Sequence, residues 1–288
     1  MKAAVVFAGS AVGACALLAM LRPLLAHPSL SRINYAGRDI PTAAGILFPA
    51  VYVPACVIIL MVEGGGTQVF GVRESLLLLV VGMCLLGLVD DVAGNRDARG
   101  FKGHFKALFN GEVTTGMLKA AGGFVLAIAA VISFSLRWWD VIVNAAIIAL
   151  AANLGNLMDI APGRSIKVFL PAFIGVVALN WRAPVDVMPY LLVVGATALA
   201  LFSGDLAERF MLGDAGSNVL GATIGLAVAV GAGWWWRLEA LAFLLLMNAL
   251  SEKFSFSSII ASNRALNWLD SLGRMYPPDK EGEGVGGK

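Results

Sequence analysis

Charged side chains are scarce in this sequence. Only 14% of its 288 residues are Asp, Glu, Lys or Arg, while 59% are hydrophobic, and the mean hydropathy is +0.81. A soluble domain of this size would struggle to stay in solution with such a composition. The net charge of +2 is also too small to indicate a nucleic-acid partner, and no basic run with interleaved aromatic residues is present. The composition therefore predicts a protein embedded in a membrane.

Histidine and cysteine are scarcer still, with two and three residues respectively. The cysteines lack metal-ligand spacing, and His27 and His104 are isolated, so a zinc site is not expected. No GxSxG, Walker or GxGxxG pattern stands in a suitable context. A metal site in this chain would use oxygen ligands, which favour Mg²⁺ or Mn²⁺.

Long runs without charge, by contrast, are plentiful. A helix needs about 20 apolar residues to cross a bilayer core roughly 30 Å thick. Nine runs approach that length, at 3–21, 43–62, 75–89, 117–135, 138–155, 166–180, 187–203, 216–232 and 238–250. The first has no small-residue cleavage site before Arg22, so we expect a retained helix and not a signal peptide. The expected fold class is all-α, a polytopic membrane protein with about nine transmembrane helices.

Basic residues are distributed unequally between the two sides of such a bundle. If nine helices alternate in direction, sixteen of the 21 Lys and Arg residues fall on one side. The positive-inside rule places that side in the cytoplasm. We therefore expect a multi-pass protein of the plasma membrane with its N-terminus outside and its C-terminus in the cytoplasm.

The same alternation gathers the acidic clusters on the cytoplasmic side, although acidic residues play no part in that assignment. The clusters are Asp90 with Asp91, Asn156 with Asp159, Asp205 with Glu208, and Asp214. Ionisable residues at the ends of membrane helices are costly to bury and are commonly functional. A secondary transporter would place its polar site near the bilayer midplane, so this pattern favours a site at the cytoplasmic surface.

Each cluster also has a simpler interpretation. Asp90 and Asp91 would act as a stop signal where a helix leaves the membrane; adjacent residues point about 100° apart on a helix, so the two need not share a ligand. Asp214 would hold Mg²⁺ beside a phosphate at a helix N-terminus, or would simply cap that helix. For Asn156 and Asp159, a capping role and a ligand role are both open.

A loop rich in glycine and cations follows the paired aspartates. Arg99, Lys102 and Lys106 would neutralise phosphates there, and the glycines would allow the backbone to approach them. A basic loop lying against anionic lipid is the alternative.

The C-terminal part of the sequence changes in character. Residues 255–273 place apolar side chains among polar ones, which predicts an interfacial helix on the cytoplasmic leaflet, with a loop packed under the bundle as the alternative. We expect a transmembrane catalytic domain over 1–250, a cytoplasmic interfacial segment over 251–276 and a disordered tail over 277–288.

Taken together, these motifs resemble those of the polyprenyl-phosphate N-acetylhexosamine-1-phosphate transferase superfamily, which includes phospho-N-acetylmuramoyl-pentapeptide transferase. The likeness runs from about Tyr35 to Ser258 in the family's order. Its matches are Pro41, Thr42 and Gly45 with the basic Arg38, LVDD at 88–91, RGF at 99–101 followed by Lys106, NLMD at 156–159, MLGDAGS at 211–217 and SEKFSF at 251–256.

The resemblance implies an activity. A sugar 1-phosphate, of the N-acetylhexosamine kind, would pass from a UDP-sugar to a polyprenyl phosphate with release of UMP, in the synthesis of a cell-envelope glycopolymer. It implies that Asp90, Asp91 and Asp214 are catalytic, that Asp214, Asp91 and Asp159 serve the Mg²⁺ or Mn²⁺ site, and that Asp90 orients or deprotonates the lipid phosphate. The substrate-binding residues it implies are Arg38, Arg99, Lys106, Asn156, Asp159 and Ser217.

Two departures from the family pattern have consequences. Pro162 stands where the family has a second aspartate after Asn-Leu-x-Asp-Gly, so one expected ligand is absent. The family's histidine-rich motif and its final transmembrane helix have no counterpart after the last matched segment, which argues against the muramoyl-pentapeptide member. A catalytically inactive membrane protein that keeps the fold for binding or scaffolding is therefore the alternative function. The oligomeric state stays open, a homodimer included.

Overall fold

The computed structural model describes residues 2–34, 37–63, 71–94, 114–181 and 187–274. Within these ranges the chain forms α-helices, two 3-10 helices (η1 and η2) and one pair of short strands. The elements are α1 (Lys2–Leu25), η1 (Pro28–Leu30), β1 (Ser31–Ile33), β2 (Asp39–Pro41), η2 (Ala44–Ile46), α2 (Leu47–Glu63), α3 (Val72–Ala93), α5 (Thr115–Val131), α6 (Trp138–Met158), α7 (Arg164–Asn180), α8 (Met188–Leu206), α9 (Asp214–Gly231), α10 (Trp234–Ser251), α11 (Phe256–Ser262) and α12 (Arg264–Ser271).

Each of the nine predicted apolar runs coincides with one long helix, from α1 to α10, to within a few residues. Among the described residues, six helices are long and apolar enough to cross a membrane, and a seventh span is counted if α10 and α11 form one bent unit. The apolar helix α5, with 17 residues, is shorter than a full span. The protein thus has the architecture of an all-α polytopic membrane protein, but six or seven spans meet these criteria where we predict nine.

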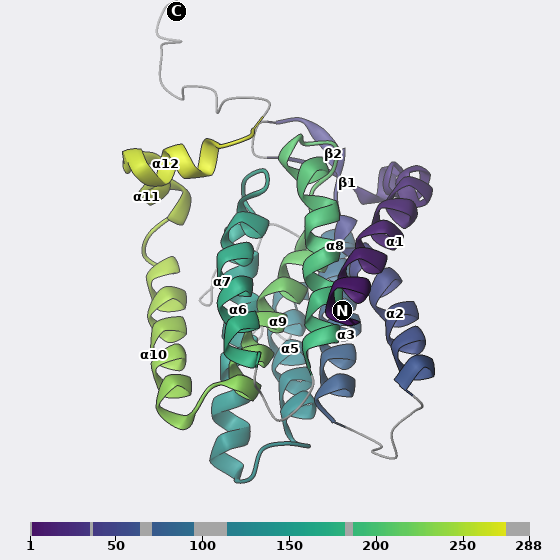
Figure 1. Ribbon diagram of the computed structural model, residues 1–288. Coiled ribbons are helices and arrows are strands. Elements are labelled where there is room, and N and C mark those ends of the chain that lie inside the picture. Colours follow the sequence, from purple (N-terminus) through teal and green to yellow (C-terminus); the bar gives the residue numbers. More distant parts are fainter. Residues whose placement is uncertain (1, 35–36, 64–70, 95–113, 182–186, 275–288) are drawn as a thin grey trace, which may run out of the picture.

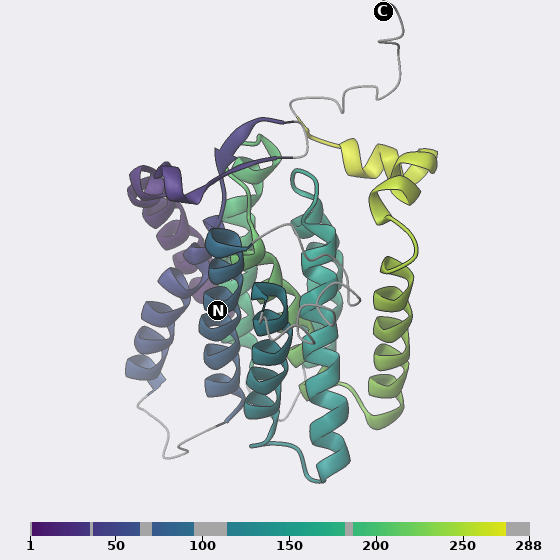
Figure 2. The ribbon, with the colours of Figure 1, turned by 180° about the vertical axis from the view of Figure 1, so that it is seen from behind.

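Helix α9 lies at the centre of the bundle. The long helices run side by side, and α9 packs against α3, α6 and α7 (Figures 1 and 2). Glycines on α9 allow the approach to α6: a Cβ on Gly225 would lie 2.7 Å from the Cα of Ile148, and one on Gly221 would overlap the carbonyl of Ala151. Small residues bring helix backbones together in this way in membranes, where burial of apolar surface supplies little driving force. The close contacts fix the position of the start of α9.

Gly87 gives a testable case of this packing. A Cβ on Gly87 of α3 would overlap the backbone carbonyl of Asp214, the first residue of α9. We expect Gly87→Ala to destabilise the protein by about 2 kcal/mol, because backbone cannot move aside as a flexible side chain can. The matched control is Gly175→Ala in α7, where nothing lies within 4 Å of the added Cβ. Unfolding in detergent should show no loss for the control; equal losses for both variants would contradict the close approach of α3 and α9.

Residues 41–45 hold the loop before α9 by backbone hydrogen bonds, a contact that the sequence did not lead us to expect. Strands β1 and β2 pair antiparallel, and the chain then runs beside the loop at 211–213. Met211 donates its N–H to the carbonyl of Pro41 at 2.7 Å; Ala44 donates to the carbonyl of Met211 at 3.1 Å and Gly45 to that of Leu212 at 3.0 Å. Two sequence motifs far apart in the chain are therefore one structural unit.

The C-terminal helices turn away from the bundle axis. Helices α10 and α11 are bent by 89° at the break between them, and α11 and α12 lie across the same end of the bundle as the strands (Figure 1). Trp268 and Leu269 on α12 remain exposed, at 62% and 51%. The interfacial segment over 251–276 stays a prediction, and so does the tail over 277–288; residues 275–288 lie outside the described residues.

A buried ion-pair network holds α12 to the bundle. Arg164, at the start of α7, donates from Nε and NH2 to the two carboxylate oxygens of Asp270, at 2.8 and 2.7 Å. Arg274 donates to the same carboxylate at 2.5 Å, and Lys167 donates to the Asp270 carbonyl at 2.6 Å. Burial of Asp270 disfavours its charge, but the hydrogen bonds and charges of Arg164 and Arg274 outweigh that effect and lower the pKa of the carboxyl.

Candidate functional site

The candidate site begins at the junction of α3 and α9. Asp91, in the last turn of α3, accepts the backbone N–H groups of Asp214 and Ala215, each at 3.0 Å. Gly213 precedes them with φ of 72°, a conformation that glycine adopts without strain, and a Cβ there would lie 2.6 Å from the carboxylate of Asp91. A carboxylate from another helix therefore caps α9 and satisfies two of the N–H groups that a helix leaves open at its start.

This cap changes two expectations about the same helix end. We expected either a phosphate at the N-terminus of α9 or a capping role for Asp214. The first two N–H groups of α9 instead meet Asp91, and the side chain of Asp214 points elsewhere, toward Lys119. A ligand phosphate at this place would have to meet side chains and not these two amides.

Lys119 is the centre of the site. Its ammonium donates to Asp90 at 3.0 Å and also to Asp214, and it reaches them from the first turns of α5. The Asn156 amide, oriented to satisfy both neighbours, accepts from Lys119 at 2.9 Å and donates to Asp214 at 2.5 Å. One cation and two carboxylates thus meet at the end of four helices, α3, α5, α6 and α9. The sequence signal for Lys119 is a single charge inside the apolar run at 117–135, which by itself indicates no more than a basic residue near a helix end.

Ser217 contacts Asn156 from within the helical bundle. Its side chain is fully buried, and its hydroxyl lies 3.5 Å from the amide of Asn156. Gly155 lies beside it, with space for no side chain: a Cβ there would be 2.6 Å from the carbonyl of Ser217. The structure therefore places Ser217 behind Asn156, where it helps to position the amide.

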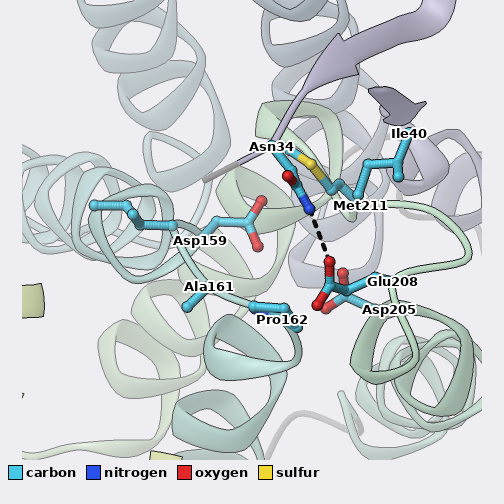
Figure 3. A pocket seen from close by; sticks show the side chains of 9 residues that line it. Asn34, Ile40, Asp159, Ala161, Pro162, Asp205, Glu208 and Met211 are labelled. Carbon is cyan, nitrogen blue, oxygen red and sulfur yellow. Dashed lines mark hydrogen bonds between the residues drawn. The ribbon is translucent and has the colours of Figure 1, made fainter. Parts of the chain in front are cut away.

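A second acidic group lies next to the first, in a small pocket (Figure 3). Asp159 faces Asp205 and Glu208 across it, and Asn34 donates to Glu208 at 2.7 Å. Arg38, predicted as a substrate-binding residue, pairs with Glu208 here. The pocket holds about 30 Å³, room for one or two waters but not for a nucleotide.

Asp159 and Asp205 differ in the groups that compensate their negative charges. Asp205 accepts backbone N–H groups from Gly163 at 3.1 Å and from Leu212 at 3.2 Å, so it ties the loop before α7 to the loop before α9. Burial raises the pKa of Asp159 well above its ordinary value, and the negative charges of Asp205, Asp214 and Asp91 add to the effect. A bound cation would relieve the repulsion among these carboxylates. Pro162 lines the same pocket, where the family resemblance leads us to expect an aspartate.

The residues present offer a magnesium ion two carboxylates and one amide oxygen, without a full cage of protein ligands. In the part of the chain that the structure describes, no three Asp, Glu, His or Cys side chains surround one point as a metal cage would. Asp90, Asp214 and the amide of Asn156 do converge, on the ammonium of Lys119. Since Mg²⁺ usually takes one or two carboxylates and completes its shell with water and substrate phosphates, this oxygen set fits it. Asp91 takes part only by fixing the start of α9 in this conformation.

Several predicted residues cannot be placed. Arg99, Lys102, His104 and Lys106 lie outside the described residues. His27 is exposed and accepts the N–H of Ser29 at 3.3 Å, which caps η1 and gives the residue a local structural role.

Comparison with known proteins identifies no family for this chain. No protein-family model matches the chain, and no curated protein is detectably similar to it in sequence. The function must therefore be argued from the site.

Proposed function

We propose that this protein is a phosphoglycosyl transferase that moves a sugar 1-phosphate from a UDP-sugar to a polyprenyl phosphate and releases UMP. One observation carries the proposal: Asp90, Asn156 and Asp214, which come from three separate motifs, meet at a single cation at one end of an apolar helical bundle. Such a place suits two substrates of different kinds. The lipid stays in the bilayer, and the nucleotide arrives from water.

In this proposal the chain's own residues position charge and do not act as strong bases. A phosphate monoester is already largely ionised near neutral pH, so its attack on a diphosphate needs orientation and charge neutralisation. Asp90 and Asp214, with the Asn156 oxygen, would hold Mg²⁺, which neutralises the donor diphosphate when bound. Asp91 fixes the start of α9 so that Asp214 faces Asp90, and Asp159 borders the site from the adjacent pocket.

The membrane placement forms part of the proposal. We propose nine crossings, with the N-terminus outside, the C-terminus in the cytoplasm and the site at the cytoplasmic face of the plasma membrane. Support comes from the geometry. The strands and α12 lie at the same end of the bundle (Figure 2), and Glu208 is held there by Asn34, which follows β1. The positive-inside rule assigns that end to the cytoplasm. The proposed role in making a cell-envelope glycopolymer comes from the family resemblance.

Release of UMP tests the proposal directly. Purified protein in detergent, given Mg²⁺, a polyprenyl phosphate and a panel of UDP-sugars, should release UMP with at least one donor. Omission of the lipid or of the metal should abolish the release. If no donor gives UMP while an authentic transferase works under the same conditions, the proposal is wrong.

A binding or scaffolding protein without catalysis is the alternative, and two observations favour it. Lys119 already neutralises the carboxylates, and Pro162 replaces an acidic residue in the adjacent pocket. This alternative predicts that Asp90→Asn and Asp214→Asn leave the cellular phenotype intact, whereas the transferase proposal predicts its loss.

A further inference from the structure

A cavity lies directly behind Lys119, between α5, α6, α9 and α10. Its walls are mainly small or apolar, and its polar side chains are Lys119, Asn153, Asn218 and Asn248. The cavity holds about 330 Å³, which is enough for a ligand group of several heavy atoms. Because Lys119 also holds Asp90 and Asp214, the cavity and the carboxylates share one cation.

One hydrogen-bond donor that lines the cavity has no acceptor among the described residues. Asn153 donates to Asn248 at 2.6 Å, and Asn248 donates to the carbonyls of Leu150 and Leu244 at 3.3 and 2.8 Å, so these two amides satisfy each other and the backbone. Asn218 is only 3% exposed, and its Nδ2 has no hydrogen-bond partner among the described residues. A buried donor without a partner is costly and rare in folded proteins. An acceptor atom on a ligand in the cavity would satisfy it.

Lys119 cannot serve the carboxylates and such a ligand at once. Its ammonium has three N–H donors, and Asp90, Asp214 and Asn156 accept all three. The ammonium occupies the point on which these oxygens converge, so a divalent cation bound to the same oxygens would displace it. The flexible four-carbon stem of lysine lets the ammonium turn toward the cavity that the residue already lines.

We propose that Lys119 is an exchangeable counter-ion. Without a divalent cation it neutralises Asp90 and Asp214; when the cation binds, the ammonium turns into the cavity and, together with Asn218, binds a phosphate group. The two ligands then bind cooperatively, because the cation frees the residue that the phosphate needs. The phosphate half of this inference rests on the proposed function, in which a lipid supplies the phosphate, whereas the exchange of Lys119 with the cation does not.

The exchange is tested by stability, without any turnover. In metal-free buffer, Lys119→Met should lower the unfolding temperature by about 5 °C or more, since two carboxylates lose their counter-ion. Added Mg²⁺ should restore that loss, and the variant should bind Mg²⁺ about tenfold more tightly than the unaltered protein because no ammonium has to leave. Lys253→Met, at an exposed position after α10, is the matched control and should change neither quantity. Weaker or unchanged Mg²⁺ binding by Lys119→Met would overturn the inference.

The phosphate half is tested by equilibrium binding of three probes: a polyprenyl phosphate, the matching polyprenol and inorganic phosphate. The polyprenyl phosphate should bind about tenfold more tightly with Mg²⁺ than without it. That gain should disappear in Lys119→Met, and Asn218→Leu, which keeps the volume but removes the donor, should weaken binding about tenfold. Competition by inorganic phosphate would show that a free phosphate also suffices. Equal binding of polyprenol and polyprenyl phosphate would refute a phosphate site.

The outcomes separate this inference from the proposed function. If the protein releases no UMP but Lys119→Met binds Mg²⁺ more tightly, the exchange of Lys119 is supported and the transferase function is refuted. If the protein releases UMP but Lys119→Met does not change Mg²⁺ binding, the transferase function is supported and the exchange of Lys119 is refuted.

Discussion

Replacement of Asp214 by Asn is expected to reduce UMP release by at least a hundredfold. Asp214 and Asp90 are the two carboxylates that meet at Lys119, and the proposed reaction depends on the charge they hold there. Loss of one preorganised electrostatic group in an active site commonly costs a factor of 100 to 1,000, as a rough guide. The measurement is the initial rate of UMP release at saturating Mg²⁺. Asp39→Asn, at an exposed position on β2, is the control and should keep the full rate.

Variants of the two neighbouring aspartates, Asp90 and Asp91, should differ in stability when they are compared in the same way. Asp90→Asn should lose activity and keep most of its stability, since the amide can still contact Lys119. Asp91→Asn should lose both, because an amide offers one acceptor where the backbone N–H groups of Asp214 and Ala215 need two. If all three Asn variants keep the rate of the unaltered protein, the carboxylate cluster is not catalytic.

The largest expected effect on stability concerns Asp270. Asp270→Asn leaves the buried guanidinium groups of Arg164 and Arg274 without a counter-charge. Removing one partner of a buried ion pair costs about 3–5 kcal/mol, so the backbone amides of α12 should exchange with solvent roughly two to four orders of magnitude faster. Hydrogen exchange followed by mass spectrometry measures this change. Arg264→Gln, exposed on the same helix, should have no such effect; if it does, the network is not what holds α12.

This effect should depend on pH in a defined direction. Because the pKa of Asp270 is lowered in the folded protein, its carboxylate adds stability at pH values above the unfolded pKa, about 4. That contribution is lost as the pH falls through the folded value. The difference in exchange between Asp270→Asn and the unaltered protein should therefore be constant near neutrality and shrink below about pH 4.

The sequence predicted the helices well because apolar length is a local property. Each of the nine runs is a helix, and the grouping of Asp90, Asp91 and Asp214 at one end followed from simple alternation. The number of spans was less secure, because α5 and α7, with 17 residues each, lie near the minimum length and α10 turns sharply into α11.

Contacts between residues far apart in the chain could not be predicted from the sequence. The pairing of Asp91 with the start of α9 depends on the approach of two backbones at Gly87, which no local pattern reports. The role of Lys119 could not be predicted either, because it depends on α5 lying beside α3 and α9. The link between Arg164 and Asp270 spans 106 positions and has no periodic signature.

The contact between residues 41–45 and the loop before α9 also has a consequence for the order of events during synthesis. The N–H groups of Ala44 and Gly45 find their acceptors on residues that the ribosome adds more than 160 positions later. At about 5–20 residues per second, that interval lasts roughly ten to thirty seconds. During that time α1 and α2 can insert and β1 can pair with β2, while the N–H groups of Ala44 and Gly45 have no acceptor yet. A nascent chain that stops before residue 211 should be a favoured target for quality-control proteases, and one that passes residue 217 should not.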